Sequence, residues 1–111
     1  MYLPNHFVWG TQTYVMGVIN VTPDSFSGDG LGQKDKLVDN ALELGTNFVK
    51  AGAHLLDIGG ESTRPGSSTI TIREELDRVI PVVQALADNV SVPISIDTSK
   101  SIVADEALTA G

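Results

Sequence analysis

The sequence predicts an α/β fold in which parallel strands alternate with helices. Short apolar runs alternate with longer stretches whose apolar residues recur at three- and four-residue spacing, as in buried strands followed by amphipathic helices. This pattern occurs three times in 111 residues, and strands joined through helices lie parallel with right-handed crossovers. A polar residue stands at, or one residue before, the end of each strand: Asn20, Asp57 and Asp97.

The first unit is expected to open with a short β-hairpin around Gly10-Thr11, because this pair suits a type II′ turn with glycine at its first central position. Residues 15–19 are apolar throughout, which predicts a strand that is buried on both faces. After a loop to about residue 32, an apolar stripe predicts a helix that ends near Gly52. The stripe comprises Leu37, Val38, Ala41, Leu44, Gly45, Phe48 and Val49.

The second unit repeats the pattern with a strand at 54–58 and a loop to about residue 70. Thr71 and Glu74 form a capping box, which predicts the start of the second helix. Pro81 lies within the helix pattern and predicts a kink, unless the helix begins near it. The apolar stripe of this helix comprises Leu76, Val79, Ile80, Val83 and Leu86.

The third unit has a strand at 92–97 and a helix that Thr98 or Ser101 is expected to cap. Because parallel sheets bind ligands at the carboxyl ends of their strands, the polar residues at the strand ends should lie together around one binding site. Periodicity alone fits a barrel or a flavodoxin-like sheet. A (β/α)₈ barrel takes about 250 residues, so three units cannot close one; a flavodoxin-like module would need about five strands.

The composition limits the partners of the chain. It is 41% hydrophobic and 19% charged, as in one soluble globular segment, and its formal net charge of -7 argues against binding nucleic acid or anionic lipid. No apolar run approaches the roughly 18 residues of a membrane helix, and the N-terminus lacks the layout of a secretory signal. There are no cysteines. We therefore expect a cytoplasmic protein.

The loops after the first two strands carry the residue types of a binding site. Asn20 and Asp24 supply hard oxygen ligands, enough to hold a Mg²⁺ that keeps its other positions for water and phosphate. In the second loop, Gly59-Gly60 permits close backbone approach, and Arg64 is an anion donor. Composition alone also permits two solvated loops, and Asp97 could simply cap the third helix.

Three segments together resemble the motifs of dihydropteroate synthases. VINVTPDSFS, DIGGESTRPGS and ISIDTSK occur in this order, and the resemblance covers about residues 14–111. Related pterin-binding methyltransferase domains share the fold and the strand-end carboxylates, but the first two motifs are not expected of them. Residues 28–30, Gly-Asp-Gly, depart from the SFSDGG that is common in the family, which puts the backbone path after Ser27 in doubt.

The resemblance implies that residues 1–111 are the N-terminal portion of one pterin-binding (β/α)₈ TIM-barrel domain. It implies a folate-pathway transferase that condenses 6-hydroxymethyl-7,8-dihydropterin diphosphate with para-aminobenzoate, giving 7,8-dihydropteroate and diphosphate. It also implies a Mg²⁺ cofactor and a homodimer for the full-length protein. An inert fragment, or a domain of the pterin-binding methyltransferase type, is the alternative.

The resemblance also implies binding roles for individual residues, and no catalytic residue is assigned among them. Asn20 binds Mg²⁺ with Asp24 as its partner, and Asp97 hydrogen-bonds the pterin ring with Asp57 in support. The other substrate contacts are Thr63 at the pterin diphosphate and Phe26, Arg64 and Pro65 at para-aminobenzoate. Arg64 and Lys100 are the cations available to the departing diphosphate. Further binding residues of the family are expected beyond Gly111. We therefore expect the 111-residue chain alone to be inactive and not to behave as a monomer.

Overall fold

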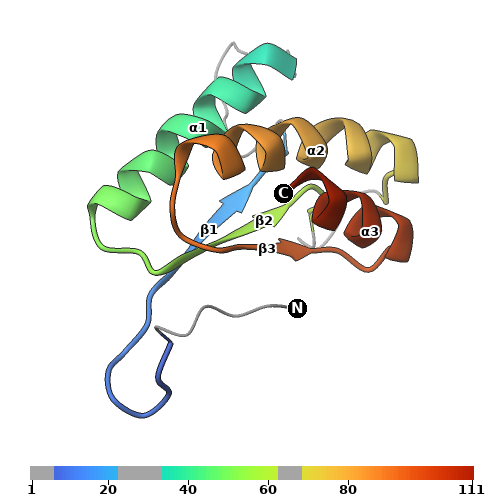
Figure 1. Ribbon diagram of the computed structural model, residues 1–111. Helices are drawn as coiled ribbons and strands as arrows, with labels where there is room; N and C mark the ends of the chain where they lie inside the picture. The colour runs from blue at the N-terminus through green and yellow to red at the C-terminus, as the bar shows by residue number, and fades with distance from the viewer. Residues whose placement is uncertain (1–6, 23–33, 63–68) are drawn as a thin grey trace.

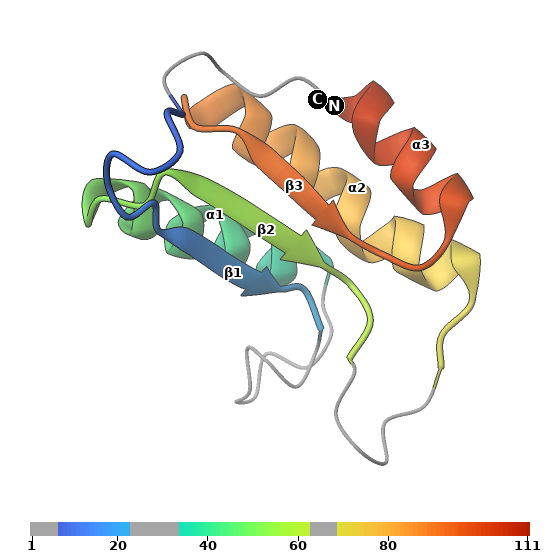
Figure 2. The same ribbon diagram turned by 90° about the horizontal axis from the view of Figure 1, so that it is seen from below.

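The computed structural model describes residues 7–22, 34–62 and 69–111. In these residues, three strands form one parallel sheet in the order β1 (Met16–Asn20), β2 (Leu55–Gly59) and β3 (Ile94–Asp97). Three helices alternate with them: α1 (Lys34–Lys50), α2 (Ile72–Asn89) and α3 (Ser101–Ala110). The helices lie on one face of the sheet (Figures 1 and 2). The predicted α/β class and parallel strand order are confirmed.

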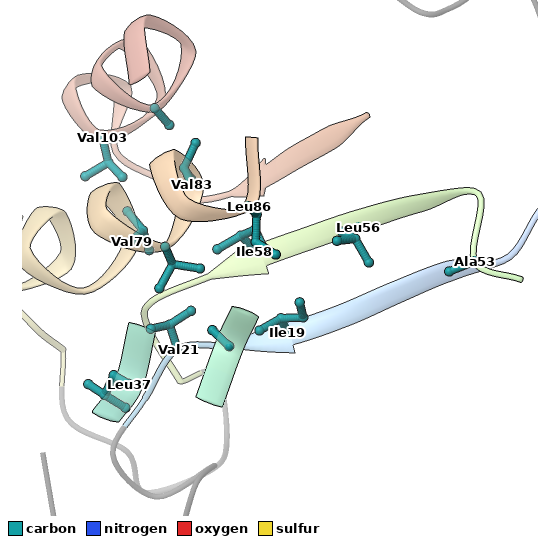
Figure 3. Close-up of a cluster of buried hydrophobic side chains, with 13 residues drawn as sticks. Ile19, Val21, Leu37, Ala53, Leu56, Ile58, Val79, Val83, Leu86 and Val103 are labelled. Atoms are coloured by element: carbon teal, nitrogen blue, oxygen red, sulfur yellow. The ribbon is translucent and has the colours of Figure 1, made fainter. Parts of the chain in front are cut away.

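The core lies between the sheet and the helices. Ile19, Leu56 and Ile58 are fully buried and project from β1 and β2 into the cluster shown in Figure 3. Gly45 lets α1 approach this cluster closely, because a Cβ at this position would lie only 2.6 Å from Leu86 Cδ2 on α2. The residues of both predicted helix stripes are buried or pack against this core. Across the described residues, no helix is long and apolar enough to span a membrane.

The opposite face of the sheet is not covered by these helices (Figure 2). Met16 and Val18 of β1 each leave 48% of their surface exposed on this open face, whereas Gly17 and Ile19 are buried on the other. The prediction that the first strand is buried on both faces is therefore wrong for the described structure. The strand is apolar on both faces, but α1, α2 and α3 supply packing partners to only one of them.

The end of α1 follows its glycine signal. Ala53 N–H donates to the Phe48 carbonyl (2.9 Å), and Gly52 N–H donates to the Val49 carbonyl (3.1 Å). Gly52 has φ +110°, the left-handed conformation that this Schellman arrangement requires at its turning residue. The predicted stop near Gly52 is confirmed.

The start of α2 follows its capping box. Thr71 Oγ1 accepts a hydrogen bond from Glu74 N–H (3.1 Å), as predicted, and α2 then continues through Pro81. The caps predicted for α3 are wrong. Lys100 occupies the N-cap position without a side-chain cap: the Thr98 hydroxyl accepts from the N–H of Lys100, two residues later in the chain (3.1 Å), and Ser101 is already helical.

The predicted hairpin is present only as a turn. Thr11 N–H donates to the Val8 carbonyl (3.3 Å), which makes Gly10 the third residue of the turn, with φ +90°. This is the position at which a type II turn requires positive φ, so the predicted type II′ turn is wrong. Over residues 7–15 no strand is formed; the Val15 N–H donates to His54 Nδ1 (2.9 Å) instead.

Candidate functional site

The polar residues at the ends of the strands lie together at the carboxyl end of the sheet, on its open face. The register pairs Asn20 with Gly59 and Gly59 with Asp97, so these three residues form a row across the carboxyl end of the sheet. Asp57 lies two residues before Gly59 on β2 and therefore points to the same side, because side chains alternate along a strand. The predicted placement of Asn20, Asp57 and Asp97 on one face is confirmed.

Gly59 leaves the middle of this row without a side chain. A Cβ at Gly59 would stand 3.7 Å from the Asp97 carboxylate, so even an alanine would fill the space beside it. Asn20 and Asp97 are both exposed. The row thus presents an amide and a carboxylate on either side of a glycine that has no side chain.

The Asp57 carboxylate is held from the neighbouring strand. Ser95 Oγ donates to Asp57 Oδ1 at 2.6 Å, and the two residues are register partners on β2 and β3. Because Ser95 fixes one carboxylate oxygen, the orientation of Asp57 is set before any ligand arrives. The sequence motifs did not single out Ser95, although it stands two residues before Asp97 on the same face of the strand.

A second set of polar residues joins the loops that follow β2 and β3. The Glu75 side chain is fully buried near the start of α2; its Oε1 accepts from Lys100 Nζ (2.7 Å) and its Oε2 from Thr98 Oγ1 (2.6 Å). Lys100 Nζ also donates to Glu61 Oε1 at 2.9 Å. We call Glu61, Glu75, Thr98 and Lys100 the interloop cluster.

The interloop cluster alters the ionisation of its members. The hydrogen bond to Glu75, followed by that to Glu61, raises the pKa of Lys100 above its ordinary value of 10.5. The hydrogen bond from Lys100, followed by that from Ile70 N–H, lowers the pKa of Glu61 below its ordinary value of 4.5. Lys100 was expected to be available to a departing diphosphate, but in the structure it binds two carboxylates.

Sequence reasoning missed Glu75, although a signal was present. Glu75 stands four residues before Val79 and seven before Val82, so it lies on the buried stripe of α2. A charged residue on such a stripe needs a buried partner, because an unpaired charge in the core is costly.

The remaining predicted site residues, Asp24, Phe26, Thr63, Arg64 and Pro65, lie outside the described residues. The exposed amide oxygen of Asn20 fits one ligand position of Mg²⁺, a hard cation that keeps several water or phosphate ligands. The described residues contain no group of three or more His, Cys, Asp or Glu side chains that could hold an ion.

Residues 16–111 match the family model described as pterin binding enzyme. The chain belongs to this family. It is 50% identical over 105 residues to the dihydropteroate synthase of Synechocystis and 51% identical over 108 residues to that of Bacillus subtilis. These matches cover 95% and 97% of this chain but 35% and 37% of the relatives, so the chain spans little more than a third of their length.

Solved structures of family members have the same arrangement. A Xanthomonas albilineans dihydropteroate synthase with 4-aminobenzoic acid superposes with a TM-score of 0.83 at 46% identity, covering 91% of this chain and 36% of that one. A Clostridium difficile dihydropteroate synthase crystallised with pteroic acid gives a TM-score of 0.85 at 50% identity, covering 95% and 39%. The three βα units of this pterin-binding family member are part of a TIM barrel, which decides against the flavodoxin-like sheet.

Proposed function

We propose that residues 1–111 form the first three βα units of a dihydropteroate synthase, which joins 6-hydroxymethyl-7,8-dihydropterin diphosphate to para-aminobenzoate. The observation that carries the proposal is the row of Asn20, Gly59 and Asp97 with Asp57 beneath it, at the edge where TIM barrels bind substrates. Dihydropteroate synthases similar to this chain were solved with 4-aminobenzoic acid, pteroic acid and 7,8-dihydropteroate.

The two carboxylates suit a pterin. A pterin ring offers adjacent N–H donors along one edge, and a carboxylate accepts such a pair with charge-assisted hydrogen bonds. In the proposed site Asp97 accepts from the ring, Asp57 supports it in the orientation that Ser95 fixes, and Gly59 leaves room for the ring beside Asp97.

The reaction breaks the bond between the pterin methylene carbon and the diphosphate oxygen and forms a C–N bond from the amine of para-aminobenzoate, which loses a proton. Positive charge develops on the pterin as diphosphate leaves. The negative charge of Asp97 beside the ring favours that charge. Asp97 thus serves both recognition and the reaction.

The metal and the other substrate contacts are proposed from the family resemblance. Asn20 and Asp24 hold Mg²⁺, which neutralises diphosphate charge when bound. Thr63 contacts the pterin diphosphate, and the para-aminobenzoate side comprises Phe26, Arg64 and Pro65. We also propose that the full-length enzyme is a cytoplasmic homodimer, a location that agrees with the absence of cysteine in this segment.

A chimera tests the proposal. Residues 1–111 are joined to the part of the Bacillus subtilis synthase that follows the matched segment, and the purified protein is assayed for dihydropteroate with both substrates and Mg²⁺. We expect turnover. A folded chimera that binds pterin but forms no dihydropteroate favours the methyltransferase alternative. A second chimera is made in the same way with the Escherichia coli synthase, which is 51% identical to this chain, as a control for a junction that disturbs folding. If neither chimera forms dihydropteroate, the proposal is contradicted.

A further inference from the structure

We infer that Glu75 and Lys100 are positioning residues, which hold the loops after β2 and β3 in a fixed relation and so align the two substrates. The inference rests on the proposed function, because the second loop leads to Thr63 and Arg64 while the third strand ends in Asp97. Neither Glu75 nor Lys100 needs to touch a substrate for this role.

The geometry of Glu75 supports this role. Its carboxylate is fully buried, and both of its oxygens are occupied by groups from the loop after β3: Lys100 Nζ at 2.7 Å and Thr98 Oγ1 at 2.6 Å. Thr98 follows Asp97 directly in the chain and also accepts from Lys100 N–H (3.1 Å). The buried carboxylate therefore fixes the segment that follows Asp97 from both ends.

Lys100 extends the connection to the other loop. The same ammonium group that binds Glu75 donates to Glu61 Oε1 at 2.9 Å, and Glu61 Oε2 accepts from Ile70 N–H at 3.3 Å. Glu61 stands two residues before Thr63. One cation thus links a residue of each loop to a single buried anchor on α2.

A second contact between α2 and the β2 loop runs parallel to the first. Arg78 Nη1 donates to the Gly60 carbonyl at 2.9 Å. The loop lies so close to the helix that a Cβ on Gly60 would stand 2.6 Å from Val79 Cγ1 and 3.4 Å from Glu75 Cγ. One helix therefore contacts both loops, the β2 loop through the Gly60 carbonyl and the β3 loop through the side chains of Thr98 and Lys100, whereas β2 and β3 hold Asp57 and Asp97 independently through the sheet.

Because the helix and the sheet hold different parts of the site, loss of the Glu75 contact should affect the rate and the binding of the pterin ring differently. Without the Glu75 anchor, Asp57 and Asp97 remain on their strands, so binding of the pterin ring should persist, whereas the Thr63 contact to the diphosphate should weaken. The second loop then loses its relation to them, so the amine and the methylene carbon are no longer aligned. A misplacement of about 1 Å costs on the order of 100-fold in rate.

The variant Glu75→Gln tests the inference in the chimera described above, with Glu43→Gln on the exposed side of α1 as a matched loss of charge. We expect kcat/KM for para-aminobenzoate to fall roughly 100-fold, while the Kd for 6-hydroxymethyl-7,8-dihydropterin, which lacks the diphosphate assigned to Thr63, changes less than about threefold. Lys100→Met should have a similar effect, and the double variant should be no worse than either single one, because both remove the same link. Lys100→Arg should restore part of the rate.

Several outcomes would overturn the inference. Unchanged kinetics in a folded Glu75→Gln chimera would do so, as would additive effects of the two substitutions. An equal loss of pterin affinity and of thermal stability would assign Glu75 to the core instead. An inactive parent chimera would count against the proposed function alone. In that case hydrogen exchange on the folded but inactive chimera decides, since Glu75→Gln should expose amides in residues 60–62 and 98–100 together, and unchanged protection there would contradict the inference.

Discussion

Asp57 and Asp97 share a face of the sheet, but their surroundings suit them to different tasks. Ser95 occupies one oxygen of Asp57 at 2.6 Å, whereas Asp97 is exposed at the end of its strand beside the bare backbone of Gly59. A carboxylate that is already bound serves as support, and an exposed one can receive a ligand. We therefore assign the main pterin contact to Asp97.

Asp97→Asn should weaken pterin binding in the chimera without loss of the fold. The substitution keeps the shape of the side chain but replaces the charge that accepts from the ring. A hydrogen bond to a charged group contributes about 1.5 to 3 kcal/mol, which corresponds to roughly 10- to 150-fold in Kd. Calorimetric titration measures the change. An unchanged affinity would contradict the assigned contact.

Ser95→Ala should weaken pterin binding less. It removes a neutral donor, and an ordinary hydrogen bond contributes about 0.5 to 1.5 kcal/mol, or roughly 2- to 13-fold in Kd. The same titration compares the two variants. A larger effect of Ser95→Ala than of Asp97→Asn would reverse the roles of the two carboxylates.

The interloop cluster should make stability depend on pH in a defined window. Because the pKa of Glu61 is lowered in the fold, its contribution is present above the ordinary value of 4.5 and is lost as pH falls through the folded pKa. Because the pKa of Lys100 is raised, its contribution is present below 10.5 and is lost as pH rises through the folded pKa. Melting temperatures of the chimera and its Glu61→Gln variant should therefore differ most between these limits and converge in acid. A constant difference at all pH values would contradict this account.

At the scale of whole elements, the sequence predicts what depends on neighbouring residues. The Schellman end at Gly52 and the N-cap at Thr71 are local patterns, and both are found in the structure. The interloop cluster was missed because its pairs are distant in the chain: Lys100 is 25 residues from Glu75 and 39 from Glu61. No periodicity or motif announces such pairs, except the single Glu on the buried stripe of α2.

Predictions from local sequence were wrong where contacts with distant residues determine the structure. Gly10-Thr11 has the composition of a hairpin turn, but Val15 N–H pairs with His54 Nδ1 instead of with another strand. The burial of β1 depends on which elements cover each face of the sheet, and the sequence of the strand itself contains no information about them. Placement of Asn20, Asp57 and Asp97 was predictable because parallel strands share a direction and side chains alternate.

Gly60→Ala should show how tightly the β2 loop is fitted against α2. The new Cβ would meet Val79 Cγ1 at 2.6 Å, and Val79 is β-branched and fully buried, so it has little freedom to move. Overpacking of this kind costs about 1 to 3 kcal/mol. Denaturant unfolding of the chimera measures it. Val79→Ala in the same protein creates the missing space, so the double variant should lose less stability than the sum of the single losses; strict additivity would contradict the close fit.

At the scale of the whole molecule, the described structure has one covered face and one open face. The open face combines the candidate site at one end with the apolar side chains of Met16 and Val18 below it. A cavity of about 50 Å³ lies between β3, α2 and α3. It is lined by Val83, Ile94, Ile96, Ala107, Leu108 and Gly111, of which Leu108 is 70% exposed. Both surfaces have the composition of contacts that further barrel units would make.

The 111-residue chain alone should therefore catalyse no condensation and should not be a monodisperse monomer. Apolar sheet surface that is open to water favours association, and the outer edges of β1 and β3 have no partner strand among the described residues. Catalysis should fail separately, because Lys100 is bound to Glu61 and Glu75 and few donors are left to balance a departing diphosphate. Light scattering and a dihydropteroate assay with Mg²⁺ test the two halves, and the chimera serves as the positive control. A monodisperse monomer that turns over substrate would show that three βα units suffice for this chemistry.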